Sequence, residues 1–320
     1  MEVLWLSAQD VRNTGLTAEE CMGLVRKAVE WQTAGQLEAP PKLGIHPPKG
    51  RHIHAMPAFI PPMDSVGVKW IADFPQNYLQ GLPTITALII LNSPETGVPL
   101  CVLEGGTITA MRTAAMTGVT LRLCANPDVR TATILGTGTQ ARAHAILLPK
   151  ALPSLEAIRV VGLVPKDATA FCREMGPSLH CELIPFPDRG EAVRGTDVVV
   201  TVTTAVTTRL LEPDWLASGI TAVVLDNGGK ETTILHSMDR VIVDNRDAFA
   251  SEEVRQRFPT GLPRIDADLG QILTGRLKGR GNAQERVLVL NLGIAVCDIA
   301  VATEVYRRAV ISKLGVMMKL

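Results

Sequence analysis

The sequence predicts an α/β protein that joins a parallel sheet, covered by helices on both faces, to a mixed α+β part. From residue 131 onward, apolar runs of strand length alternate with helical patterns, which is typical of a parallel sheet. A glycine-rich turn links the first of these runs to a helix at residues 136–138. Before residue 125 the chain instead reads as a helix followed by strands joined by turns, which predicts a largely antiparallel sheet.

The composition supports a folded chain without a large electrostatic bias. The chain has 320 residues, 46% hydrophobic and 20% charged, and its 32 Lys and Arg balance 32 Asp and Glu. This balance gives no argument for a nucleic acid or a membrane surface as partner. Six scattered cysteines form no C-x-x-C pair, so we expect a reducing compartment and no metal site. Without a signal-like start or a long apolar run, a cytoplasmic protein is expected.

In the N-terminal part, capping residues mark the helices. Ser7 and Thr17 are candidate helix starts, and Thr17 with Glu20 fits a capping box before a helix over 18–34. The proline-rich segment 39–48 is expected as an edge strand or an ordered loop. Strands are expected at 51–57, 66–71, 84–91 and 98–103, a helix at 107–123, and a final long amphipathic helix at 293–313 that packs back on this part.

The central part predicts seven strands in alternation with helices. The strand ranges are 131–135, 158–163, 182–185, 197–202, 222–226, 240–243 and 287–291, with a helix at 168–175 and a turn near 212–217. We find no internal repeat and no low-complexity tract.

The turn after the first central strand fits the dinucleotide-binding fingerprint G-x-G-x-x-A. Gly136 permits the sharp turn, Gly138 lets a pyrophosphate approach the backbone, and Ala141 lets the helix pack closely on the strand. The free N–H groups and positive dipole end of the helix then favour phosphate. An ordinary strand-to-helix turn is the alternative. The pattern therefore predicts a Rossmann-like domain that binds a dinucleotide through Gly136, Thr137, Gly138, Thr139 and Gln140.

The second central strand leaves the choice between NAD and NADP open. It lacks the acidic residue that holds a ribose 2′-OH in NAD-binding proteins, because Gly162 stands in that place. Lys166 is either a partner for a 2′-phosphate or a solvated loop residue.

Lys69 is the most informative single residue of the N-terminal part. It interrupts the apolar run of residues 66–71. A buried lysine is costly without a partner or a task. Strand alternation alone favours the alternative, in which Lys69 points outward to solvent.

Several segments together resemble the ornithine cyclodeaminase and mu-crystallin family, which also contains archaeal-type alanine dehydrogenases and imine reductases. The matching segments, in chain order, are Met56-Pro57-Ala58, Gly67-Val68-Lys69-Trp70, Phe74-Pro75-Gln76-Asn77, Gly81-Leu82-Pro83-Thr84, Thr109-Ala110-Met111-Arg112-Thr113-Ala114-Ala115, Gly136-Thr137-Gly138, and Leu292-Gly293-Ile294-Ala295 with Asp298. The resemblance implies a substrate-binding and dimerisation domain over 1–124, completed by 293–320. It implies a Rossmann-like NAD(P)-binding domain over 125–292, and a homodimer.

The resemblance also implies roles for individual residues. Lys69 would contact the substrate carboxylate and exchange protons, and Arg112 would lie where that carboxylate meets the cofactor. Arg112 falls near the start of its predicted helix, where the helix dipole does not favour a cation. Thr84, Thr113 and Gly293 would contact the cofactor, although both threonines can instead satisfy local backbone groups.

Two further positions stay open between binding and structural roles. Lys42 matches a position at which relatives carry a carboxylate-binding arginine, and a solvated surface lysine is the alternative. His54 stands where cyclodeaminases carry a glutamate, so it is either a donor to the substrate or a strand residue with local partners.

This sequence lacks acidic residues at the aligned positions where cyclodeaminases bind a diamine substrate. Besides His54, our alignment places Gly228 at the position of the amine-binding aspartate, with Asp226 displaced by two residues and Lys230 nearby. These departures argue against ornithine as substrate and favour a neutral or acidic side chain, as in iminosuccinate.

The sequence therefore predicts an NAD(P)-dependent oxidoreductase acting on the C–N bond of a small 2-amino or 2-imino acid. The alternatives are a cyclodeaminase and a mu-crystallin-like binding protein.

Overall fold

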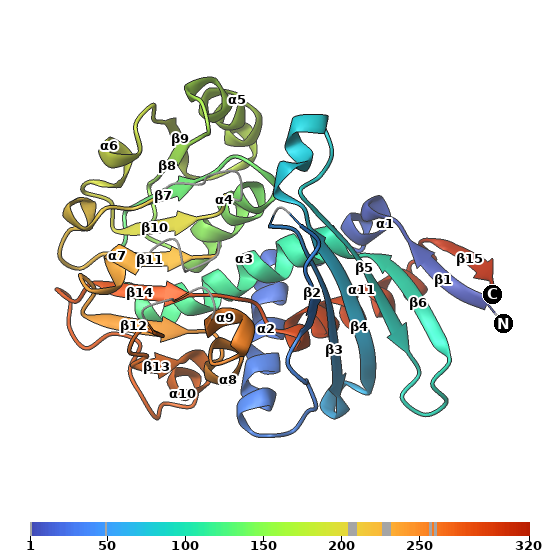
Figure 1. Cartoon of the computed structure of the whole chain (residues 1–320). Coiled ribbons are helices and arrows are strands. Elements are labelled where there is room, and N and C mark those ends of the chain that lie inside the picture. Colours follow the sequence, from blue (N-terminus) through green and yellow to red (C-terminus); the bar gives the residue numbers. More distant parts are fainter. Residues whose placement is uncertain (1, 49, 204–209, 226–231, 256–257, 259–260) are drawn as a thin grey trace. The chain divides into compact units, whose positions relative to one another are not determined.

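The chain forms two compact units in a computed structural model that describes residues 2–48, 50–203, 210–225, 232–255, 258 and 261–320. The first unit comprises residues 1–115 and 293–320, and the second comprises residues 116–292. Figure 1 labels the elements of both units.

The first unit is built on a seven-stranded mixed sheet with the order β15-β1-β6-β5-β4-β3-β2. Neighbouring strands are antiparallel except β1 and β6, which run parallel. This confirms the expected mixed α+β part. The strands are β1 (Glu2–Leu6), β2 (Leu43–Ile45), β3 (His52–Ile60), β4 (Ser65–Asp73), β5 (Ile85–Asn92), β6 (Pro99–Glu104) and β15 (Val316–Lys319).

One face of this sheet is covered by helix α11 (Ala295–Ile311), which contacts β3, β4 and β5. Helix α2 (Ala18–Thr33) packs against α11 and begins at the predicted Thr17 capping box, and the short α1 (Ala8–Asn13) begins at Ser7. Two 3₁₀ turns, η1 (Pro61–Met63) and η2 (Pro75–Gln80), connect β3 to β4 and β4 to β5.

The opposite face of the sheet carries exposed apolar side chains. Leu43, Ala55, Trp70 and Leu88 lie in one lateral row across β2, β3, β4 and β5. Leu43, Trp70 and Leu88 are 73%, 48% and 41% exposed. Because neighbouring strand positions point to opposite faces, the residues on either side of Trp70 point into the unit.

The second unit is built on eight parallel strands in the order β13-β12-β14-β11-β10-β7-β8-β9. This confirms the Rossmann-like parallel sheet. The strands are β7 (Thr131–Leu135), β8 (Ala157–Val161), β9 (Glu182–Pro185), β10 (Val198–Thr201), β11 (Thr221–Val224), β12 (Arg240–Val243), β13 (Ala267–Asp268) and β14 (Val287–Leu290).

The four central strands of this sheet, β7, β10, β11 and β14, end at the same level. Leu135 of β7 lies beside Thr201 of β10, which lies beside Val224 of β11, which lies beside Leu290 of β14. The next residues of these strands therefore line one carboxyl edge of the sheet. In open parallel sheets, ligands bind at this edge.

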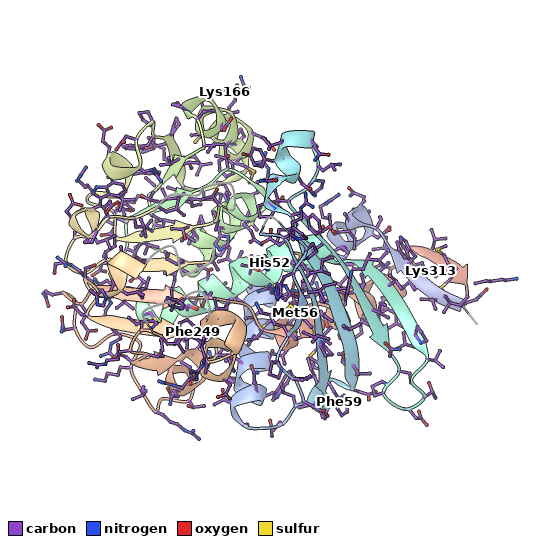
Figure 2. The ribbon with its side chains drawn as sticks, in the orientation of Figure 1. His52, Met56, Phe59, Lys166, Phe249 and Lys313 are labelled. Carbon is purple, nitrogen blue, oxygen red and sulfur yellow. The ribbon has the colours of Figure 1, made fainter. Side chains whose placement is uncertain are left out.

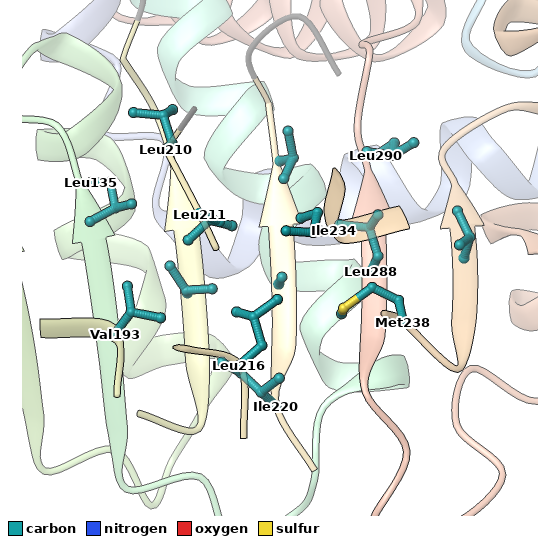
Figure 3. Close-up of a cluster of buried hydrophobic side chains, with 14 of the residues drawn as sticks. Leu135, Val193, Leu210, Leu211, Leu216, Ile220, Ile234, Met238, Leu288 and Leu290 are labelled. Atoms are coloured by element: carbon teal, nitrogen blue, oxygen red, sulfur yellow. The ribbon is translucent and has the colours of Figure 1, made fainter. Parts of the chain in front are cut away.

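Buried apolar side chains on one face of this sheet form a core. Figure 3 shows Leu135 of β7 and Leu288 and Leu290 of β14 within it, together with Leu210, Leu211 and Met238 from the connecting segments. The longer helices of this unit are α4 (Thr139–Ala151) and α5 (Pro165–Met175), and α3 (Gly105–Cys124) enters it from the first unit. The shorter helices and 3₁₀ turns are η3 (Gly176–Ser178), α6 (Arg189–Val193), η4 (Pro213–Trp215), α7 (Thr232–Leu235), α8 (Arg246–Phe249), α9 (Glu252–Arg255) and α10 (Leu269–Leu273).

The structure adds strands that the sequence patterns do not predict. β13 has only two residues and β15 is fully exposed at a sheet edge, so neither shows an alternating pattern, whereas β1 lies between β15 and β6 and was not predicted. The all-exposed β15 is an edge strand that pairs with β1. Among the described residues, no helix has the length and apolar character needed to cross a membrane. All six cysteines are free thiols, and five of them are buried.

Candidate functional site

Lys69, Arg112 and Asp298 form a buried charged cluster inside the first unit. Lys69 Nζ lies 2.7 Å from one carboxylate oxygen of Asp298, and Arg112 Nε donates to the other at 2.8 Å. The side chains of Lys69 and Asp298 are fully buried, and that of Arg112 is 8% exposed. The structure thus rules out the outward alternative for Lys69.

Packing between β4 and α11 brings Lys69 and Asp298 together. Gly67 precedes Lys69 by two residues and so lies on the same face of β4. A Cβ at Gly67 would stand 2.4 Å from the carbonyl oxygen of Ile90 and 3.3 Å from Cδ1 of Ile299. Glycine at this position therefore avoids a clash with the backbone of β5, and Ile299 of α11 packs beside it, in the helix whose first turn places Asp298 beside Lys69. A carboxylate is also favoured at the N-terminus of a helix.

Arg112 lies in the interior of its helix, which corrects the expectation that it stands near the helix start. The carboxylate of Glu104 accepts hydrogen bonds from the backbone N–H groups of Gly106 and Thr107, at 2.6 and 2.9 Å. These bonds cap α3 two residues before the predicted start, so the helix begins at Gly105. The placement of Arg112 depends on its ion pair with Asp298 and not on the helix dipole.

Gly293 makes room for the guanidinium of Arg112. Its φ is +83°, and a Cβ there would lie 2.7 Å from Nη1 and 3.0 Å from Nη2 of Arg112. The segment from Gly293 to Asp298 thus supplies both the space for Arg112 and the carboxylate that binds it.

The charges of the cluster leave a buried positive excess. One carboxylate faces two cations, and the charge of Lys42 also acts on Lys69. Burial lowers the pKa of the Lys69 ammonium from its usual 10.5 to about 8; Asp298 opposes this shift, and Arg112 and Lys42 add to it. A buried positive excess favours an anionic ligand, and an ammonium with this pKa exchanges its proton near neutral pH.

Other predicted residues lie in the same unit. His54, on β3, is 9% exposed and faces the side of the sheet that holds Lys69, because Met56 pairs with Lys69 and lies two residues from His54. Figure 2 labels Met56 and His52 on this strand. The ring of His54 lies 6.0 Å from that of His52.

The other predicted site residues of the first unit differ in burial. Thr113 follows Arg112 in α3 and is buried, whereas Lys42 is half-buried just before β2. Thr84 lies just before β5, where its carbonyl oxygen accepts a hydrogen bond from the backbone of Phe74. Asp226, Gly228 and Lys230 lie outside the described residues.

The glycine turn of the second unit has the geometry of a phosphate-binding turn. Gly136 has φ +137°, and a Cβ there would stand 2.9 Å from the carbonyl oxygen of Val202, so the turn requires glycine. Gly138 caps α4 without a side-chain hydrogen bond, and the place of its missing Cβ has no neighbour within 4 Å among the described residues. As far as the described residues show, the N-terminus of α4 therefore has room for an anion.

The residues that flank the turn also fit a phosphate-binding role. Ala141 is fully buried, which allows the close packing of α4 that the fingerprint requires. Thr137 is half-buried and Thr139 is exposed at the first position of α4. The Oε1 atom of Gln140 is buried and makes no hydrogen bond in the described part of the chain. An orphaned acceptor beside an open helix N-terminus fits a site that a bound dinucleotide would complete.

No acidic residue stands at Gly162, just after β8, and the acidic side chain beside this position is that of Asp167 in α5. A Cβ at Gly162 would stand 2.7 Å from Cβ of Asp167 and 2.9 Å from the carbonyl oxygen of Val164, so no aspartate fits at this position. Lys166, labelled in Figure 2, is exposed at the start of α5.

Two buried polar residues, Asp298 and Asn291, were not predicted as site residues from the sequence. Asp298 entered only as part of a matching segment, although a lone acid within the apolar run 294–302 is the signal that singled out Lys69. Asn291 ends the last strand pattern without any distinguishing feature in the sequence.

Comparisons with known proteins agree on one family. A model of the ornithine cyclodeaminase/mu-crystallin family matches residues 1–313. The nodulation efficiency protein NfeD of Rhizobium meliloti is 32% identical over 305 residues, covering 95% of this chain and 94% of that protein.

Two solved structures share the whole fold. The Δ1-pyrroline-2-carboxylate reductase of Thermococcus litoralis, in complex with NADH and L-proline, is similar with a TM-score of 0.90 and 28% identity over 98% of this chain and 99% of that one. An archaeal alanine dehydrogenase dimer with bound NAD has a TM-score of 0.87 and 28% identity, and each chain is fully covered.

The contact between Gly293 and Arg112 predicts a stability difference between two glycine substitutions. Gly97 has a similar φ of +72° but no neighbour within 4 Å, so Gly97→Ala adds only backbone strain, about 1–2 kcal/mol. Gly293→Ala also displaces Arg112 from its buried ion pair, and we expect a further loss of about 3 kcal/mol. Urea unfolding of both variants measures the difference. Equal losses would show that Arg112 does not depend on Gly293.

Proposed function

This chain belongs to the ornithine cyclodeaminase/mu-crystallin family, and we propose that it is an NAD(P)-dependent imine reductase or amino-acid dehydrogenase acting on small 2-imino or 2-amino acids. The observation that carries the proposal is the buried Lys69–Asp298–Arg112 cluster, whose positive excess suits the carboxylate of an amino or imino acid. The open glycine turn of the second unit supports a dinucleotide cofactor, as do the NAD and NADH bound in the two solved relatives.

Each residue of the cluster has a distinct chemical role in this proposal. Arg112 binds the substrate carboxylate through its terminal nitrogens, because its Nε is already occupied by Asp298. Lys69 holds the proton that the imine nitrogen takes up as the carbon is reduced. The nicotinamide, when bound, supplies the hydride that reduces this carbon. Asp298 fixes the positions of both cations. Thr84, Thr113 and Gly293 remain proposed cofactor contacts.

The substrate side chain is proposed to be neutral or acidic. Lys42 adds positive charge near Lys69, and His54 stands where cyclodeaminases carry a glutamate. A dicarboxylate imine such as iminosuccinate fits this charge balance, whereas the second ammonium of ornithine does not.

The proposed reaction predicts oxidation of reduced cofactor with imino acids. We expect a fall in absorbance at 340 nm with oxaloacetate or pyruvate plus ammonia, or with Δ1-pyrroline-2-carboxylate. NADH and NADPH are compared in parallel. Lys69→Met should lower kcat at least about 100-fold, since it removes the proton donor. Lys27→Met, at an exposed lysine on α2, should leave kcat unchanged.

Other outcomes of this assay separate the alternatives. Faster turnover of pyruvate or cyclic imines than of oxaloacetate with ammonia would reject the dicarboxylate. Release of ammonia from ornithine or lysine without net change at 340 nm would identify a cyclodeaminase. Cofactor binding without turnover on any of these compounds would indicate a binding protein of the mu-crystallin kind.

The lowered pKa of Lys69 predicts the pH dependence of the reduction. The ammonium must be protonated to serve the imine nitrogen, so kcat/KM should fall as the pH rises through about 8. In Asp298→Asn the carboxylate that favours the protonated form is lost, so the fall should move to lower pH. A kcat/KM profile that stays flat from pH 6 to 10 in the unaltered enzyme would exclude Lys69 as the proton donor.

The exposed sheet face predicts a homodimer. Exposed apolar side chains aligned across neighbouring strands favour an interaction surface, and one of the solved relatives is a dimer. We propose that the row containing Leu43, Trp70 and Leu88 is covered by a second copy of the chain. Trp70→Glu should convert the dimer to a monomer in sedimentation at micromolar concentration. Leu163→Glu, at a 59% exposed site in the second unit, should not. A dimer unaffected by Trp70→Glu would place the interface elsewhere.

A further inference from the structure

Asn291 is a buried amide without a hydrogen-bond partner. It directly follows β14 and is 4% exposed. Neither its Nδ2 nor its Oδ1 makes a hydrogen bond within the described part of the chain. Its backbone N–H donates to the carbonyl oxygen of Val224 at 3.1 Å, so the sheet ladder fixes where the residue stands.

Other buried polar side chains of this sheet are satisfied. Thr133 donates to the carbonyl oxygen of Ala192 at 2.8 Å, and Thr221 accepts from Arg280 at 2.9 Å. A buried amide that lacks both partners costs folding free energy, and such orphans point to a missing ligand. Asn291 is thus the exception in a sheet that otherwise pairs its polar groups.

Asn291 and the glycine turn stand at the same edge of the sheet. Gly136 follows Leu135, and Asn291 follows Leu290, and these two strand ends lie in one register across β7, β10, β11 and β14. Three strand intervals separate them, which is about 14 Å. A dinucleotide whose pyrophosphate lies at Gly136 extends along this edge in both directions.

The position of Asn291 relative to the glycine turn indicates which half of the dinucleotide it would contact. In the Rossmann arrangement the strand next to the glycine turn, here β8, carries the residue that reads the adenosine ribose. β8 and β9 lie on one side of β7, and β10, β11 and β14 lie on the other. Asn291 therefore belongs to the nicotinamide half.

An asparagine side chain offers two N–H donors and a carbonyl acceptor, and its best complement is another primary amide. Nicotinamide carries such a carboxamide. We propose that Asn291 pairs with the carboxamide of the nicotinamide ring and so fixes the orientation of the ring at this edge of the sheet. This inference rests on the proposed function, since it assumes a nicotinamide cofactor.

Binding measurements with cofactor fragments test the pairing. Calorimetric titration would compare NADH, ADP-ribose, which lacks the nicotinamide, and 3-acetylpyridine adenine dinucleotide, in which a methyl group replaces the amide NH₂. We expect Asn291→Leu to weaken the binding of NADH at least 10-fold and to change the affinity for ADP-ribose less than 2-fold. The affinity for the acetylpyridine analogue should fall less on this substitution than the affinity for NADH, because the analogue makes fewer hydrogen bonds to Asn291.

A matched asparagine provides a stability readout that does not need a ligand. Asn126 donates from Nδ2 to the carbonyl oxygens of Gly219 and Ala283, at 3.2 and 3.1 Å. Asn126→Leu should therefore lower the Tm of the ligand-free protein, whereas Asn291→Leu should raise it by a few degrees because it removes an unpaired buried amide.

The outcomes separate this inference from the proposed function. Equal NADH affinity in the unaltered protein and Asn291→Leu, with ADP-ribose bound by both, would overturn the pairing and leave the dinucleotide site standing. Failure of the unaltered protein to bind either NADH or ADP-ribose would overturn the proposed function as well. A fall in Tm for Asn291→Leu equal to that for Asn126→Leu would show that the Asn291 amide is already paired, and would also overturn the inference.

Discussion

The carboxylate of Asp298 is the constraint on which the first unit depends. It is fully buried and lies within 2.8 Å of both Lys69 and Arg112. Neither cation is tolerable at its depth without this partner, because an unpaired buried charge costs more free energy than most single contacts return. The carboxylate in turn neutralises only one of its two partners. The cluster is therefore stable enough to fold and still favours one more anion, which is the property a carboxylate-binding site needs.

Small residues make this cluster possible by letting large elements approach closely. Gly67 avoids a clash with the backbone of β5 at a point where Ile299 of α11 packs on β4, and Gly293 leaves room for the guanidinium of Arg112. These glycines lie far apart in the chain, and Gly293 is the one that adjoins a partner of the Asp298 carboxylate, namely Arg112. The opposite face of the same sheet, with Trp70 exposed, remains apolar and open. One sheet thus carries the charged site on its covered face and the proposed dimer surface on the other.

The second unit places backbone groups and a few polar side chains at one edge of its parallel sheet. Parallel strands that end in register place Gly136 and Asn291 on one line. The unpaired atoms of Gln140 and Asn291 lie where a dinucleotide is expected, so the free protein holds unsatisfied polar groups that a bound cofactor would complete. The unpaired Asn291 amide then lowers the stability of the unliganded unit, and under the proposed pairing it raises the affinity for the cofactor.

The sequence by itself determined the parallel sheet, the glycine turn, the helix caps and the family, because these depend on local periodicity and on residues close together in the chain. It singled out Lys69 but left its direction open, since alternation alone favoured the outward face. Only the tertiary structure decided that Lys69 is buried, that Asp298, more than two hundred residues later, is its partner, and that Arg112 lies inside its helix and not near its start. Contacts between residues so distant in the chain leave no local pattern, because the packing of α11 against β3, β4 and β5 creates them.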